Sequence, residues 1–256
     1  MEMKFYRAAL LAVTCFFVGC DEAPKPAQTT TPATVLEGKT MGTFWRVSVV
    51  GVDAKRAAEL QVKIQTQLDA DDQLLSTYKN DSALMRFNLS NSLSPWPVSD
   101  AMADIVTSAL RIGAKTDGAM DIAVGPLVNL WGFGPAQQPL HIPTQGKIDA
   151  AKAQTGLSHL KVVNEAHQNY LQKDLPDLYV DLSTVGEGYA ADHLARLMAQ
   201  EGIARYLVSV GGALNSRGMN AEGHPWRVAI QKPTDRENAV QAIVDINGHG
   251  ISPSGS

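Results

Sequence analysis

The sequence is poor in cysteine, in net positive charge and in long apolar runs. It has 2 Cys in 256 residues, and its 22 Lys and Arg stand against 26 Asp and Glu, a formal net charge of −4 at pH 7. The absence of a basic run argues against a nucleic-acid-binding protein, because phosphate neutralisation requires a basic face. An anionic ligand would therefore have to be held by backbone N–H groups or by a metal ion.

Familiar catalytic motifs are missing as well. The sequence has no H-E-x-x-H zinc motif, no Walker loop and no G-x-S-x-G nucleophile elbow. Its 6 His are scattered singly, and none is assigned a role, because a lone His more often serves structure than catalysis. With 45% hydrophobic and 19% charged residues, the composition indicates a folded protein with a sizeable core.

The first twenty residues have the features of a bacterial lipoprotein signal. Lys4 and Arg7 precede an apolar stretch over residues 8–19 that is too short for a permanent membrane span, and the stretch ends at Cys20. We expect cleavage before Cys20 and lipidation of its thiol; the plainer alternative is an ordinary signal peptide with a chance Cys. Asp21 resembles the signal that keeps Gram-negative lipoproteins on the inner membrane, which would anchor the protein on its periplasmic face.

These features divide the chain into three segments. Residues 1–19 would be the signal peptide, which takes Cys15 with it. Residues 20–34 would be the lipidated Cys and a flexible tether rich in Pro, Thr and Ala. Residues 35–256 would form the folded domain, with no thiol left for a disulfide.

The folded part is expected to be α+β, with mixed, largely antiparallel sheets and packed helices. Apolar periodicity and capping residues predict helices over 54–68, over 100–118 with Met102, Ile105, Ala109 and Ile112 inward, over 146–154 and over 188–200. Alternation and β-branched runs predict strands at 43–50, 159–163, Tyr170, 179–182, 206–210, 226–230 and 239–246.

The stretch 178–191, LYVDLSTVGEGYAA, carries the most chemical information. We expect an apolar strand that delivers Asp181 and a helix that opens at Gly186 and Gly188, where glycines and a helix N-terminus would form a phosphate cradle. A carboxylate beside a phosphate needs a divalent cation between them, and Mg²⁺ prefers oxygen ligands. Two alternatives stay open: Asp181 and Ser183 only cap the helix, or G-E-G-Y-A-A is a dinucleotide fingerprint whose acidic partner is missing.

Two further glycine-containing segments stand out. Gly211 and Gly212 follow a predicted strand, and a hairpin turn with positive φ explains them better than an anion-binding nest. In residues 116–135 four glycines interrupt an apolar run, which predicts a ligand-shaped loop with Trp131 and Phe133 either lining it or packed in the core.

Five blocks of sequence together resemble the ApbE family of FAD:protein FMN transferases. They are MGTFWRV (41–47), LSTYKNDSALMRFN (75–88), TDGAMDIAVGPLVNLWGFGP (116–135), VDLSTVGEGYAADHLA (180–195) and SVGGALNSRGMNAEGHPWRVAI (209–230). The resemblance implies a Mg²⁺-dependent enzyme that transfers the FMN moiety of FAD through a phosphoester bond to a Thr or Ser hydroxyl of a target flavoprotein and releases AMP. It also implies targets among subunits of membrane redox pumps, the Na⁺-translocating quinone reductase and Rnf-type complexes.

The resemblance further implies roles for individual residues. Those matched to the FAD site are Met41, Tyr78, Ala119 at the end of the 116–119 loop, Asp181 and Glu187. Thr184 would offer its backbone carbonyl to Mg²⁺. Glu187 stands where the family more often has Lys, so we expect it to accept a hydrogen bond from a sugar or the adenine instead of binding phosphate.

The family pattern is longer than this chain. It continues with a T-S-G block, a His-containing segment and an Asp-x-x-x-Thr motif that completes the metal site, whereas this chain reads ISPSGS at 251–256. We therefore expect a folded domain that is incomplete at its C-terminus, and no catalytic base is identified. The alternatives are a truncated module that binds FAD without turnover and an FAD pyrophosphatase that releases free FMN.

Overall fold

The computed structural model describes residues 32–135, 141–234, 239–246 and 248–253. The described residues all belong to one compact unit of the chain. The predicted signal peptide, Cys20 and most of the predicted tether lie outside the described residues. No described helix combines the length and the hydropathy needed to span a bilayer.

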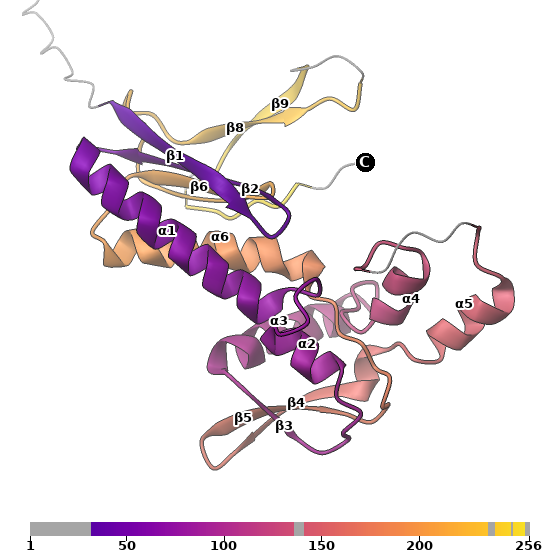
Figure 1. The fold of residues 1–256 in the computed structure, drawn as a ribbon. Coiled ribbons are helices and arrows are strands. Elements are labelled where there is room, and N and C mark those ends of the chain that lie inside the picture. The colour runs from indigo at the N-terminus through magenta and orange to yellow at the C-terminus, as the bar shows by residue number, and fades with distance from the viewer. Residues whose placement is uncertain (1–31, 136–140, 235–238, 247, 254–256) are drawn as a thin grey trace, which may run out of the picture. The chain divides into compact units, whose positions relative to one another are not determined.

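A four-stranded antiparallel sheet with strand order β1-β2-β6-β7 organises one part of the fold (Figure 1). Its strands are β1 (Ala33–Thr40), β2 (Thr43–Val50), β6 (Tyr206–Val210) and β7 (Ala213–Arg217). The predictions of strands at 43–50 and 206–210 are confirmed. The unpredicted β1 begins at Ala33, slightly before the expected start of the folded domain.

Helices α1 (Ala54–Leu75) and α6 (Ser183–Gln200) pack together against one face of this sheet (Figure 1). Helix α1 starts where Asp53 accepts a hydrogen bond from the backbone N–H of Arg56, and it extends beyond the predicted end at Leu68. The core between sheet and helices contains Trp45, Val47, Val49, Leu60, Ile64, Leu68, Ala190, Leu194, Val208 and Val210, all buried.

A second core lies between two helices and a three-stranded antiparallel sheet of order β3-β5-β4. These elements are α2 (Ala83–Asn88), β3 (Trp96–Val98), α3 (Asp100–Lys115), β4 (Leu160–Glu165) and β5 (Gln168–Lys173). Ser99 caps α3, as predicted. The prediction that Ile112 faces inward is wrong: it is 39% exposed, because Leu157 packs against the bare backbone of Gly113 and turns that side of the helix to the core.

The remaining strands are β8 (Arg227–Gln231) and β9 (Val240–Asp245), an antiparallel pair on the other side of the four-stranded sheet (Figure 1). The remaining helices are α4 (Gly125–Leu130), α5 (Gln145–Lys152) and the 3₁₀ turn η1 (Leu157–His159). Trp226 and Ile246 are buried between the pair and the sheet. All named strand pairs are antiparallel and helices pack on the sheets, so the predicted α+β class is confirmed.

Candidate functional site

A cavity of about 530 Å³ lies where the β1–β2 turn, the end of α1 and the start of α6 meet, and we call it the α1–α6 cavity. Its lining residues are Met41, Gly42, Asp72, Leu75, Ser76, Thr77, Tyr78, Lys79, Leu182, Ser183, Gly186 and Glu187. Three residues that the sequence assigns to one site, namely Met41, Tyr78 and Glu187, are therefore brought together from distant parts of the chain.

Met41 and Gly42 form the two-residue turn between β1 and β2. Both have positive φ, 49° for Met41 and 74° for Gly42, which is the backbone that a tight hairpin turn requires. The Met41 side chain is half-buried and packs against the core beneath the sheet. The turn thus carries Met41 to the rim of the cavity and holds its backbone in place.

Tyr78 presents a largely exposed aromatic ring at the cavity, with 67% of its surface accessible. Its hydroxyl donates a hydrogen bond to the carbonyl of Phe133 at 3.2 Å, and its backbone N–H donates to Ser76 Oγ at 3.1 Å. The hydroxyl holds one end of the ring and the backbone of Tyr78 is held at Ser76, while the largely exposed ring remains available for stacking on a planar ligand. Phe133 and Trp131 are both exposed, so the alternative that they belong to the core is wrong.

The segment 178–182 does not contain the strand predicted at 179–182, so this prediction is wrong. The segment joins no sheet ladder, because side chains and loop backbone satisfy its polar groups instead. The amide of Asn88 donates to the carbonyl of Val180 and accepts from its N–H, both at 2.8 Å, as a paired strand would. The N–H of Asp181 donates to the carbonyl of Ile122 at 2.8 Å.

Lys173 secures the beginning of the same segment. Its side chain is 1% exposed, and its ammonium donates to three backbone carbonyls, those of Phe87, Asn88 and Leu178, at 3.3–3.4 Å. Burial lowers the pKa of this ammonium. Asn88 and Lys173 together fix the backbone that leads into α6. No sequence signal singles them out, because the bonds of Asn88 to Val180 and of Lys173 to Phe87 and Asn88 join residues far apart in the chain.

Asp181 lies immediately before α6 and is 8% exposed. Its Oδ1 accepts a hydrogen bond from the N–H of Ser183, the first residue of α6, at 2.8 Å. The N-cap residue of α6 is Leu182, and no side chain makes a cap hydrogen bond there, so Asp181 holds the turn before the helix and is not its N-cap. Asp181 does not line the cavity itself, whereas its neighbours Leu182 and Ser183 do. Thr184 follows in the first turn of α6, is exposed and is also outside the lining.

The predicted phosphate cradle at a helix opening is wrong in its position. Helix α6 begins at Ser183, so Gly186 and Gly188 lie inside the helix, and no described strand directly precedes α6, contrary to a dinucleotide fingerprint. Gly186 nevertheless lines the cavity. A Cβ at Gly186 would find Leu75 Cδ1 at 4.0 Å as its nearest neighbour, so protein packing does not require a glycine there. Gly186 therefore leaves space at the cavity wall.

Glu187 connects the cavity to the β6–β7 hairpin. A Cβ at Gly211 would lie 1.9 Å from Glu187 Oε1, so the carboxylate rests directly against the turn. Gly211 and Gly212 join β6 to β7 with φ of 55° and 104°, which confirms the predicted hairpin. Burial raises the pKa of the Glu187 carboxyl.

Ala119 lies elsewhere. It is exposed in the loop after α3, beside Asp117 and Gly118, which have positive φ. These two residues border a separate surface hollow next to Leu157, and none of the three lines the α1–α6 cavity. The structure therefore does not bring Ala119 together with Met41, Tyr78 and Glu187.

Two charged residues of the cavity are missed by the sequence patterns. Lys79 Nζ lies 2.6 Å from Asp72 Oδ2, and both side chains line the cavity. Lys79 belongs to the block LSTYKNDSALMRFN, in which the resemblance points only to Tyr78.

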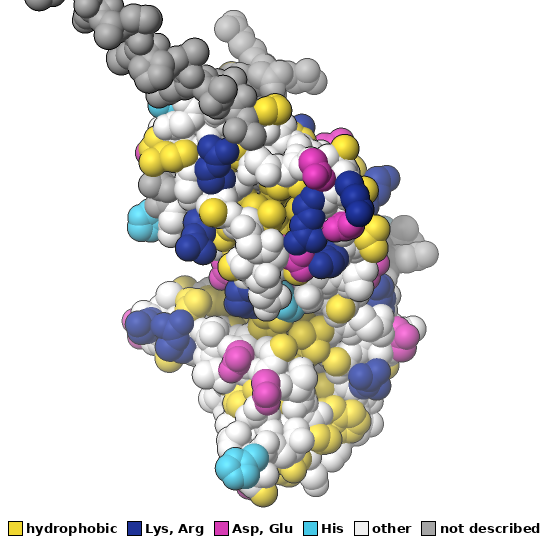
Figure 2. Space-filling view, turned by 90° about the vertical axis from the view of Figure 1, so that its left-hand side faces the viewer, with side chains coloured by type: hydrophobic (Ala, Val, Ile, Leu, Met, Phe, Trp, Pro, Cys, Tyr) yellow, Lys and Arg dark blue, Asp and Glu magenta, His cyan; other side chains and the backbone are white. Residues whose placement is uncertain are grey.

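Elsewhere, basic and acidic side chains lie next to each other on the described face drawn in Figure 2, in agreement with ion pairs such as Lys63 with Glu201.

The residues present do not by themselves form a metal site. Within the described ranges, no three His, Cys, Asp or Glu side chains are grouped so that they could hold an ion. Asp181 already accepts a backbone hydrogen bond, and Thr184 would supply one further oxygen. No chemical step is therefore assigned here to a metal ion.

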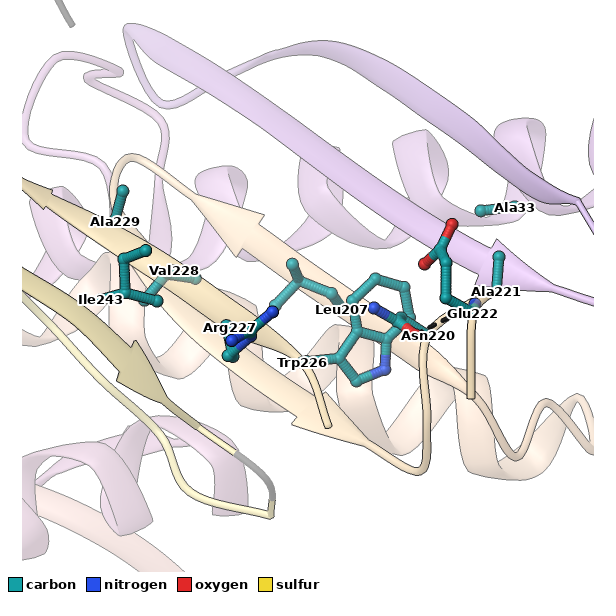
Figure 3. Close-up of a pocket in the computed structure, with 10 residues that line it drawn as sticks. All are labelled: Ala33, Leu207, Asn220, Ala221, Glu222, Trp226, Arg227, Val228, Ala229 and Ile243. Atoms are coloured by element: carbon teal, nitrogen blue, oxygen red, sulfur yellow. Dashed lines mark hydrogen bonds between the residues drawn. The ribbon is translucent and has the colours of Figure 1, made fainter. Parts of the chain in front are cut away.

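A second hollow of about 400 Å³ lies beside β8 and contains none of the predicted site residues. Leu207 and Trp226 lie next to each other in its middle, with Ile243 toward one end and Glu222 toward the other (Figure 3). Its walls carry no arrangement of charged groups comparable to the Lys79–Asp72 pair. The α1–α6 cavity is therefore the candidate site.

Comparison with known proteins shows the family of this chain. The model of the ApbE family matches residues 41–256. The FAD:protein FMN transferase of Escherichia coli (strain K12) is 80% identical over 257 residues, which cover 100% of this chain and 73% of that protein. The Salmonella typhimurium protein of the same name is 81% identical over 256 residues, with the same coverage.

Solved structures give the same result. The flavin transferase ApbE from Vibrio cholerae superposes with a TM-score of 0.81 at 40% identity, covering 88% of this chain and 72% of that one. The apo flavinyl transferase ApbE from Pseudomonas stutzeri superposes with a TM-score of 0.78 at 34% identity, covering 88% and 69%. The chain belongs to the ApbE family.

Proposed function

We propose that this chain is a FAD:protein FMN transferase that binds FAD in the α1–α6 cavity. Two relatives that are 80% and 81% identical over the whole chain carry the name FAD:protein FMN transferase, which is the name of an enzyme. The observation that carries the choice of cavity is Gly186, which leaves space at the wall beside the exposed ring of Tyr78. A planar ring system stacked on Tyr78 would lie next to that space.

The proposed reaction joins the FMN part of FAD to a Thr or Ser hydroxyl of a target flavoprotein. The hydroxyl oxygen attacks the phosphorus on the riboflavin side, a phosphoester bond forms, and the bond between that phosphorus and the bridging oxygen breaks. AMP leaves with the bridging oxygen and its electron pair, and the hydroxyl proton passes to a base. Such transfers depend mainly on positioning and on charge stabilisation around the phosphates.

The chain's own residues position the substrate in this proposal. Met41 and Tyr78 contact the rings of FAD, and the turn and hydrogen bonds that hold them keep this surface in place before binding. Glu187 accepts a hydrogen bond from a sugar or the adenine, and its carboxylate is oriented by the Gly211 turn. Asp181 accepts a hydrogen bond from the N–H of Ser183 and so holds the turn that leads into α6 at the cavity wall.

Several finer points of the proposal are supported by the resemblance alone. These are the requirement for Mg²⁺, with Thr184 as one ligand, the contact of Ala119 with FAD, and targets in the Na⁺-translocating quinone reductase or Rnf-type complexes. A lipid anchor at Cys20 on the periplasmic face of the inner membrane would place the enzyme beside such targets. Residue 20 and its surroundings lie outside the described residues.

The direct test incubates the protein with FAD, MgCl₂ and a Thr-containing target domain, with a target in which the acceptor Thr is replaced by Val as control. Mass spectrometry of the target and chromatography of the nucleotides are read together. The proposal expects the mass of an FMN group on the unaltered target only, with an equal amount of AMP. FAD binding without AMP indicates a binding module, and free FMN without target indicates a pyrophosphatase; either outcome contradicts the proposal.

A further inference from the structure

Lys79 is the only basic residue among the described residues that line the α1–α6 cavity. Its ammonium lies 2.6 Å from Oδ2 of Asp72, a residue in the last turn of α1. The Lys79 side chain is 41% exposed and that of Asp72 is 18% exposed. The ammonium is thus held at the cavity wall by one partner and remains accessible from the other side.

The backbone of Lys79 is held in place by neighbouring hydrogen bonds. The carbonyl of Lys79 accepts from the N–H of Ser82 at 2.9 Å, and the hydroxyl of Ser82 donates to the carbonyl of Ser76 at 2.6 Å. Ser82 is completely buried. A lysine on a fixed backbone can move its ammonium over a few ångströms between two acceptors without a change of fold.

The remaining charged groups in the cavity wall, Asp72 and Glu187, are acidic. An anionic group that enters would be repelled by both carboxylates, and Lys79 is the one cationic side chain in the described lining that attracts it. Lysine is a common phosphate ligand because its compact ammonium makes charge-assisted hydrogen bonds to phosphate oxygens. The Asp72 carboxylate competes with such a ligand for the same ammonium.

We propose that Lys79 binds the diphosphate of FAD, and that Asp72 holds the ammonium at the cavity wall until the diphosphate replaces it. The proposal deepens the proposed function and rests on it, because it requires that FAD occupies this cavity. It makes a distinctive demand. The two members of the ion pair must affect FAD binding in opposite directions, whereas a purely structural ion pair would affect it in the same direction.

The test measures equilibrium binding of FAD and of riboflavin, which lacks phosphate, to the full chain and its variants by quenching of flavin fluorescence. Lys79→Met is expected to raise the Kd of FAD about tenfold through loss of a charge-assisted hydrogen bond, and to leave the Kd of riboflavin unchanged. Asp72→Asn is expected to lower the Kd of FAD about threefold by releasing the ammonium. Lys79→Arg should retain most of the affinity for FAD.

Lys63→Met is the matched control. Lys63 also lies 2.6 Å from a carboxylate, that of Glu201, but outside the cavity, so its loss should leave both Kd values unchanged. Weaker FAD binding in both Lys79→Met and Asp72→Asn, or equal weakening of FAD and riboflavin in Lys79→Met, would overturn the role of Lys79. Failure of the unaltered chain to bind FAD at all would instead overturn the proposed function.

Discussion

Replacing Gly186 by Ala should stabilise the protein and weaken FAD binding at the same time. Gly186 lies within α6, where glycine is less favourable than alanine by about 0.5–1 kcal/mol. The new methyl group would meet its nearest protein atom, Leu75 Cδ1, at 4.0 Å, which is ordinary van der Waals contact. The folded state therefore loses nothing, and the melting temperature should rise by about 2–4 °C for each kcal/mol gained in a chain of this size.

The effect on binding has the opposite sign because the same methyl group projects from the cavity wall. If FAD approaches the backbone at Gly186, one added carbon forces a displacement of the kind that costs about 1–3 kcal/mol in a packed interior. Since 1.4 kcal/mol corresponds to tenfold, the Kd of FAD should increase roughly 5- to 140-fold. Thermal unfolding and fluorescence titration with FAD measure the two quantities on the same sample.

Gly188→Ala provides the control. Gly188 lies in the same helix and does not line the cavity, and a methyl group added to it would meet no protein atom within 4 Å. It should show the same gain in melting temperature with an unchanged Kd. Unchanged FAD binding in Gly186→Ala would refute the assignment of FAD to this cavity, and a fall in melting temperature would refute the packing argument.

Three further substitutions test neighbouring parts of the site. Asn88→Ala leaves the buried N–H and carbonyl of Val180 without partners and should lower the free energy of unfolding by about 2–4 kcal/mol in urea titrations. As a control, Asn164→Ala at an exposed position should change this free energy by less than about 0.5 kcal/mol. Equal effects of the two substitutions would contradict the role of Asn88. Tyr78→Phe should bind FAD within about threefold of the unaltered protein, whereas Tyr78→Ala should lose about tenfold through loss of stacking; equal losses would point to the hydroxyl instead. Burial raises the pKa of the Glu187 carboxyl above its ordinary value of 4.5, so its contribution to stability is present at low pH and is lost as the pH rises through the folded-state pKa. The free energy of unfolding of Glu187→Gln, relative to that of the unaltered protein, should therefore increase from pH 4.5 upward when both are measured by urea denaturation. A difference that does not change with pH would contradict this.

Local sequence signals predicted those elements whose cause is itself local. The alternation of Trp45, Val47 and Val49 predicts β2, and Ser99 predicts the start of α3, because pleat and cap depend on residues a few positions apart. The pair Gly211–Gly212 predicts a hairpin because few other residues adopt two successive positive φ angles.

The failures lie where distant residues decide the local structure. The segment 178–182 has the composition of a strand, yet Asn88, some ninety positions earlier, takes the place of a neighbouring strand. Helix α6 starts earlier than its glycines suggest, because apolar residues of its inner face, such as Ala190 and Leu194, pack beneath the sheet and outweigh the weak helix propensity of glycine.

The candidate site combines both kinds of information. The sequence alone pointed to the family through five ordered blocks, and that resemblance predicted that Met41, Tyr78 and Glu187 belong to one site. The structure places all three in the lining of one cavity. Tertiary structure alone decided that Lys79 meets Asp72 at the wall of this site and that Gly186 leaves room for a ligand there. The physical reason is that a motif records which residue types are present, whereas charge pairing and free space depend on which helices pack against each other.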